Sequence, residues 1–221
     1  MGLGGILQEL KTEGVLALYH DYRSGRLVDY SGNGNNGVQS GATPLMFFNK
    51  KGVVVRTGAL IVVPAGPSWR WSTAFTMLYG YDSDSRASSY TFADYVVYST
   101  GPIGALRIGS TIGWSDGINL FIGGDDVNKH KQLGLSCSNG LAGKVYNSGV
   151  YGGDLSGASV ITAPVSDLWI LYPQIDRFFG FGRYFVLIKR VLTATEHARV
   201  YGQLENMKWN TKGLPPGPMM P

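Results

Sequence analysis

The feature that most limits how this chain can fold is a succession of short runs rich in Val, Ile, Leu, Tyr and Phe. Clusters of Gly, Pro, Asn, Asp and Ser separate these runs, and such clusters favour tight turns, whereas the runs favour β-strands. The runs cover residues 16–22, 52–63, 75–81, 90–99, 105–113, 118–124, 133–138, 166–173 and 182–192. Many short strands joined by turns are typical of stacked antiparallel sheets, so an all-β fold is predicted.

The composition agrees with an all-β fold and argues against several classes of partner. Of 221 residues, 32 are glycine and 15% are charged, so we expect a surface of Ser, Thr, Asn and Gly rather than of salt bridges. The net charge of +4 is not gathered into a basic stripe, and we therefore expect no nucleic acid as a partner. No run approaches the roughly 20 apolar residues of a membrane span, so no membrane partner is expected. Cys137 is the single cysteine and is interpreted as a small buried residue on a strand.

The first 14 residues differ from the strand pattern and are interpreted as an N-terminal arm. A short helix is predicted around residues 5–11, with Ile6, Leu7 and Leu10 on one side. Because so short a helix is marginal in water, we expect it to dock on another surface. No basic leader followed by a long apolar run is present, so no secretory signal is predicted.

A second helix is predicted near the C-terminus, where Thr193 and Glu196 have the spacing of a capping box. The pattern predicts a helix to about Leu204, with three side chains facing inward and His197 as a surface or edge residue. The three inward residues are expected to be Ala194, Ala198 and Tyr201. The main domain is therefore assigned to residues 15–206, and the Pro/Gly-rich residues 207–221 are interpreted as a tail.

Gly32, Gly34 and Gly37 have the G-x-G-x-x-G spacing of a dinucleotide-binding loop. Such a loop opens a helix whose N-terminus holds the pyrophosphate. The residues after Gly37 have no helical period and no helix start signal, so the motif predicts a structural turn instead. Asp29 and Ser31 are expected to bond nearby backbone N–H groups in this turn.

Three segments carry a resemblance to a known family, and the weakest match is residues 118–124, which are similar to the family's central strand. Residues 16–39 resemble the opening strand and loop of laminin-G-like domains, in the concanavalin A-like lectin/glucanase superfamily. The matching residues are Asp29, Ser31, Gly32, Asn33, Gly34, Asn35 and Gly37. Residues 185–204 resemble the closing strand and helix of the same family. The matching residues there are Arg190, Leu192, Thr193, Glu196 and Tyr201.

This resemblance implies a two-sheet antiparallel jelly-roll sandwich in which the first and last strands pair side by side. Together with the patterns at the two ends, it predicts an all-β jelly roll with a short C-terminal helix and extended terminal arms. The chain departs from the family at Arg23 and at Arg183–Tyr184, where relatives often carry acidic residues. Functions that depend on those carboxylates are therefore not carried over.

We expect no enzymatic activity and no catalytic residues. Glucanases of this superfamily carry an E-x-D-x-x-E strand, because glycoside hydrolysis needs two carboxylates that flank the bond. Glu9, Glu13, Glu196 and Glu205 are the four glutamates, and none lies among the predicted central strands. Residues 113–117 spell G-x-S-x-G, but a strand is predicted to follow them, so they are interpreted as a surface β-turn rather than a hydrolase elbow.

One loop offers a candidate calcium site. Asp125, Asp126 and Asn128 follow a predicted strand and carry the oxygen ligands that hard cations prefer. The alternative is a solvated turn, since Lys129 and Lys131 weaken attraction for a cation. No other cofactor is expected.

Trp69 and Trp71 are the candidate ligand-binding residues. They alternate in an extended segment, so their rings would project from the same face and could stack on a glycan. The alternative is core packing, which accounts for most tryptophans.

Two non-enzymatic functions remain open. The first is a structural component of a phage virion, such as a capsid decoration or tail protein, whose partners are other virion proteins or copies of itself. It would be assembled in the host cytoplasm, which agrees with the lack of a predicted signal and disulfide. The second is a carbohydrate-binding module, with or without calcium, on a bacterial cell surface or a phage fibre.

Overall fold

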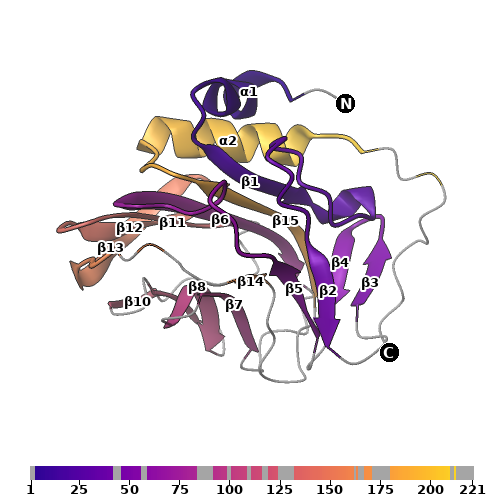
Figure 1. Cartoon of the computed structure of the whole chain (residues 1–221). Helices are drawn as coiled ribbons and strands as arrows, with labels where there is room; N and C mark the ends of the chain where they lie inside the picture. Colours follow the sequence, from indigo (N-terminus) through magenta and orange to yellow (C-terminus); the bar gives the residue numbers. More distant parts are fainter. Residues whose placement is uncertain are drawn as a thin grey trace.

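Two antiparallel β-sheets stacked face to face form the body of the protein in the computed structural model (Figure 1). The structure describes residues 3–41, 46–55, 59–83, 92–98, 101–108, 111–115, 119–123, 132–161, 163, 167–170, 180–209 and 212. Within these residues, one sheet (sheet A) has eight strands and the other (sheet B) has seven. The predicted all-β two-sheet antiparallel sandwich is therefore confirmed.

Sheet A contains the first and last strands of the domain. In spatial order it consists of β13 (Val150–Ala158), β12 (Ala142–Asn147), β11 (Gln132–Ser138), β6 (Ala74–Ser83), β15 (Gly180–Ile188), β4 (Gly52–Val55) and β3 (Met46–Asn49). The first strand, β1 (Leu16–Asp21), pairs antiparallel with β15, as the family resemblance implied. A short 3-10 helix, η1 (Tyr22–Ser24), follows β1.

Sheet B is assembled from the middle of the chain and from one strand near its start. In spatial order it consists of β10 (Leu120–Gly123), β9 (Thr111–Ser115), β8 (Gly101–Ile108), β7 (Phe92–Tyr98), β14 (Leu168–Ile170), β5 (Ala59–Val63) and β2 (Val38–Gly41). The strand β2 follows the G-x-G-x-x-G segment directly, so no helix is present there to bind a pyrophosphate.

The predicted β-turn at residues 113–117 is wrong in its first part. Gly113, Trp114 and Ser115 lie inside β9, where they pair with β8 and β10. The run 105–113 therefore contains the end of one strand and the start of the next, rather than a single strand. Strands β12 and β13 were not predicted, because their glycine-rich sequence has few of the residues that favour strands.

A layer of two helices covers the outer face of sheet A (Figure 1). The helix α1 (Gly5–Thr12) buries Ile6, Leu7 and Leu10, as the sequence predicted, and lies against α2 (Ala194–Asn206) and β1. The surface on which the N-terminal helix docks is therefore part of its own chain. Full burial of each of these aliphatic side chains contributes about 1.5–3 kcal/mol.

The capping box of α2 is confirmed, but its buried face differs from the prediction. Thr193 accepts a hydrogen bond from the Glu196 backbone N–H at 3.2 Å, and the Glu196 carboxylate accepts one from the Thr193 N–H at 2.8 Å. The buried residues of α2 are His197, Val200 and Leu204, whereas the predicted inward residues Ala194 and Ala198 are exposed and Tyr201 is half-buried. The placement of His197 at the surface or an edge was therefore wrong, because its ring packs on sheet A, where it contacts Ser136 and Tyr146.

Two apolar clusters follow from this three-layer arrangement. One lies between the sheets and includes Cys137, which is fully buried on β11 as predicted. The other lies between sheet A and the two helices. Within the described residues, neither helix is long and apolar enough for a membrane span.

Candidate functional site

The two tryptophans predicted as a ligand platform lie in the core. Their rings are close together, with centroids 6.2 Å apart, but Trp69 is 0% and Trp71 2% exposed. A ring without exposed surface cannot stack on a glycan. The prediction that these two residues contact a ligand is therefore corrected, and core packing explains both of them, since both belong to the cluster between the sheets.

Trp69 nevertheless supports a part of the surface through a hydrogen bond. Its indole Nε1–H donates to the Pro64 carbonyl oxygen at 2.9 Å. The next backbone N–H, that of Ala65, donates to Oδ1 of Asp167 at 2.8 Å. The buried Trp69 ring thus fixes the segment that follows β5. This segment in turn fixes the carboxylate of Asp167, which directly precedes β14.

The predicted structural turn is built around Asp29. Its carboxylate accepts four hydrogen bonds, from the backbone N–H groups of Tyr19, Ser31 and Asn35 and from the Ser31 hydroxyl, at 2.8–3.0 Å. Gly32 and Gly34 have φ angles of 91° and 76°, which glycine adopts without the penalty that a Cβ brings. At Gly37, a Cβ would lie 2.7 Å from Cγ2 of Ile61, so this glycine is required by close packing.

The turn is connected to the Trp69 segment. Asn35 donates from Nδ2 to the Ala17 carbonyl at 2.8 Å and accepts at Oδ1 from the Ser68 hydroxyl at 2.6 Å. The side chain of Asn35 thereby links β1 to the residue before Trp69. The turn has a structural role, and part of that role is to hold the connection that carries Pro64 and Ala65.

The most exposed tryptophan side chain in the described part of the chain is Trp169, on the outer face of sheet B. Leu168 and Ile170 point into the core and are 0% and 1% exposed, whereas Trp169 between them is 39% exposed. Trp169 pairs with Val62 of β5, and Val62 pairs with Val38 of β2. Directly paired residues share one face, so these three side chains form an apolar row across three strands.

Asp167 lies beside this row. It precedes Leu168 and continues the alternation of β14, so it lies on the same side as Trp169 and is exposed. The two side chains are separated by about 7 Å along the strand. We define the β14 face as Asp167, Trp169, Val62 and Val38.

The sequence analysis missed Trp169, although it predicted a strand over residues 166–173. A continuous apolar run such as Leu168–Tyr172 does not reveal which alternate residues face solvent. Nothing in the local sequence distinguishes Trp169 from the buried Trp69 and Trp71. The packing of the two sheets determines which face is exposed.

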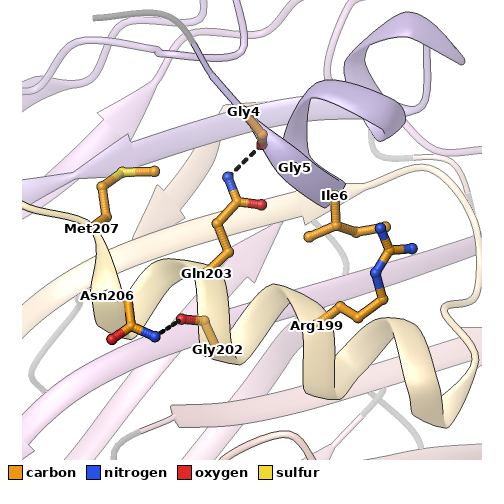
Figure 2. Close-up of a pocket in the computed structure, with 8 residues that line it drawn as sticks. All are labelled: Gly4, Gly5, Ile6, Arg199, Gly202, Gln203, Asn206 and Met207. Atoms are coloured by element: carbon orange, nitrogen blue, oxygen red, sulfur yellow. Dashed lines mark hydrogen bonds between the residues drawn. The ribbon is translucent and has the colours of Figure 1, made fainter.

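A hollow of about 630 Å³ lies between α1 and α2 (Figure 2). Its polar groups hold the two helices together. Gln203 accepts from the Leu7 N–H at 3.1 Å and donates to the Gly4 carbonyl, and Arg199 pairs with Glu9. Because these polar groups bond to one another, the hollow is part of the contact between the two helices. It is therefore a weaker candidate for a ligand-binding site than the β14 face.

Ser136 and His197 form a hydrogen-bonded pair that must be weighed as a catalytic dyad. Ser136 Oγ lies 2.8 Å from His197 Nε2, and the His197 ring stacks on Tyr146 with centroids 3.5 Å apart. Ser136 is 2% and His197 0% exposed beneath α2, so a substrate has no access to them. Burial also lowers the pKa of His197 to about 3, which makes the imidazole a poor proton acceptor at neutral pH. The pair is a structural contact between α2 and sheet A.

The predicted calcium ligands Asp125, Asp126 and Asn128 lie outside the described residues, so calcium binding stays a prediction. Elsewhere in the chain, as far as the structure describes it, no three His, Cys, Asp or Glu side chains converge as metal ligands would.

No protein-family model and no curated protein matches the sequence. Solved structures with a similar fold do exist, and several are binding domains of botulinum neurotoxins. A serotype D binding domain matches with a TM-score of 0.68 and 10% identity, over 90% of this chain and 52% of that one. The serotype D ligand-binding domain in complex with N-acetylneuraminic acid matches with a TM-score of 0.65 and 11% identity, over 90% and 52% of the two chains. The DC binding domain in complex with rat synaptotagmin II matches with a TM-score of 0.62 and 11% identity, over 91% and 53%.

The chain spans about half the length of these structures. At such low identity the similarity concerns the fold, a β-sandwich that also occurs in receptor-binding domains of toxins. The three similar structures named above are binding domains. They do not name the laminin-G-like family, so that resemblance stays a prediction from the sequence.

Proposed function

We propose that this protein is a non-enzymatic carbohydrate-binding domain and that the β14 face is its binding surface. The observation that carries the proposal is the exposure of Trp169 on the outer face of sheet B, while Trp69 and Trp71 are buried. An exposed indole in a flat apolar row offers a large rigid surface for the apolar side of a sugar ring. One structure of similar fold was solved with N-acetylneuraminic acid, which supports a glycan as the class of ligand.

We expect Trp169→Ala to weaken glycan binding by about tenfold or more, because the stacking surface is removed. The measurement is binding of the full chain to a glycan array, followed by titration of the strongest glycan. The matched control is Tyr151→Ala, which removes another exposed aromatic ring, 49% exposed, from β13 of sheet A. Equal binding by Trp169→Ala and the unaltered chain would exclude the β14 face as the site.

We further propose that this domain is a component of a phage virion, with other virion proteins or copies of itself as partners. The alternative location is a bacterial cell surface. Truncation of residues 1–14 is unsuitable as a test of assembly, because α1 is buried against sheet A and α2. We expect the full chain to co-sediment with particles and to lose this association when residues 212–221 are removed. A chain that never sediments with particles would contradict the virion setting and leave the glycan proposal standing.

A further inference from the structure

We propose that Asp167 accepts hydrogen bonds from the hydroxyl groups of the bound sugar, and that the ligand is therefore a neutral glycan rather than one that ends in a carboxylate. This inference rests on the proposed function of the β14 face. It concerns the chemistry of the ligand, on which the exposure of Trp169 alone gives no information.

The position of Asp167 suits a sugar ring stacked on Trp169. The two side chains lie on the same side of the sheet and about 7 Å apart, which is comparable to the width of one pyranose ring with its hydroxyl groups. A carboxylate is an acceptor with two oxygens, and sugar hydroxyls are donors. A ring on the indole therefore brings its edge hydroxyls toward this carboxylate.

One oxygen of Asp167 is held by the protein and the other is left for a ligand. Oδ1 accepts from the Ala65 N–H at 2.8 Å, and among the described residues this is the only hydrogen bond of the carboxylate. The connection that holds Oδ1 is itself anchored by the bond from Trp69 to Pro64. Binding a sugar therefore costs little ordering of this side chain, because it is already oriented.

The charge of Asp167 also sets which sugars are rejected. The other members of the β14 face, Val38, Val62 and Trp169, are uncharged, and so is Pro64, which the strand register places opposite Asp167. No cation among these residues offsets the carboxylate. A sugar with its own carboxylate, such as N-acetylneuraminic acid, would meet a like charge at the surface, which disfavours binding.

The test is an array that presents neutral glycans beside the same glycans capped with N-acetylneuraminic acid. For the full chain we expect binding of neutral members at least about tenfold stronger than of their sialylated counterparts. Asp167→Ala should lose most of the binding to neutral members. Asp167→Asn keeps the shape and one acceptor oxygen without the charge, and we expect it to reduce the discrimination against sialylated glycans severalfold.

The outcomes separate this inference from the proposed function. If the sialylated members bind as well as the neutral ones, or if Asp167→Asn leaves the preference unchanged, Asp167 does not select the ligand and the inference is wrong. In that case Trp169→Ala would still weaken glycan binding by about tenfold or more. If no glycan binds, both the function and the inference are wrong. Binding of a lysine-rich peptide to the full chain, weakened by Asp167→Ala, would then identify Asp167 as part of a protein-binding surface instead. Circular dichroism of each variant verifies that it is folded.

Discussion

Replacing Asp29 with alanine is expected to lower the free energy of unfolding by about 3–4 kcal/mol. The carboxylate is 6% exposed and accepts hydrogen bonds from three backbone N–H groups and the Ser31 hydroxyl. Alanine would leave these donors without their acceptor in a place that water reaches poorly. Each such loss costs about 1–3 kcal/mol when the donor stays buried, although part of the cost is recovered by relaxation of the turn.

Denaturant unfolding of the full chain measures this effect, and two further variants show its cause. Asp29→Asn keeps the shape of the side chain but replaces one acceptor oxygen with a donor, so we expect an intermediate loss. Asp154→Ala removes an exposed carboxylate on β13 and should change the free energy of unfolding by about 0.5 kcal/mol or less. If Asp29→Ala lowers the free energy of unfolding no more than Asp154→Ala does, the Asp29 carboxylate does not organise the turn.

Acidification is expected to destabilise the protein through His197. Burial lowers the pKa of His197 to about 3 in the folded chain, while an unfolded histidine has a pKa of about 6.5. Between these values the unfolded chain binds a proton that the folded chain does not. The stabilisation from His197 is therefore complete above pH 6.5 and is lost as the pH falls toward 3, by about 1.4 kcal/mol per pH unit.

Between pH 6.5 and 4.5, the effect of histidine titration on stability is separated from that of Glu196. The neighbouring Glu196 has its pKa lowered to about 2, chiefly by its hydrogen bond with Arg190, so it begins to lose its stabilising effect only below about pH 4.5. Burial lowers the pKa of His20 as well, which adds a contribution of the same sign. The difference between the unaltered chain and a His197 variant removes the effect of His20.

We expect His197→Gln to be less stable than the unaltered chain at pH 7, because it loses the stacking on Tyr146. This deficit should shrink by about 2–3 kcal/mol between pH 6.5 and 4.5, because glutamine does not titrate. Denaturant unfolding of both chains at several pH values measures it. Parallel curves over this window would contradict a buried neutral histidine at this position.

The features that the sequence predicted correctly depend on residues close together in the chain. Thr193 and Glu196 are three positions apart, and their reciprocal hydrogen bonds need only one turn of helix. Asp29 and Ser31 belong to one tight turn, and the glycines at 32 and 34 have the positive φ angles that such a turn requires. The pairing of β1 with β15 was predicted only through the family resemblance, since these strands are far apart in sequence.

The features that the sequence predicted wrongly depend on which face of an element is covered. The inward face of α2 was assigned to Ala194, Ala198 and Tyr201, but sheet A lies beneath His197 and Val200. A polar residue such as His197 carries no local sign that it will be buried. Its partners Ser136 and Tyr146 belong to β11 and β12, which are more than 50 positions away.

The tryptophans illustrate both cases. From the sequence alone, alternating strand formers and turn residues determined an all-β sandwich, the turn around Asp29 and the capped C-terminal helix, because each follows from short-range sterics and hydrogen bonds. Only the tertiary structure decided that Trp69 and Trp71 are buried and that Trp169 is exposed beside Asp167. The reason is that successive residues of a strand point to opposite faces, and the face that becomes core is decided by strands and sheets brought together from distant parts of the chain.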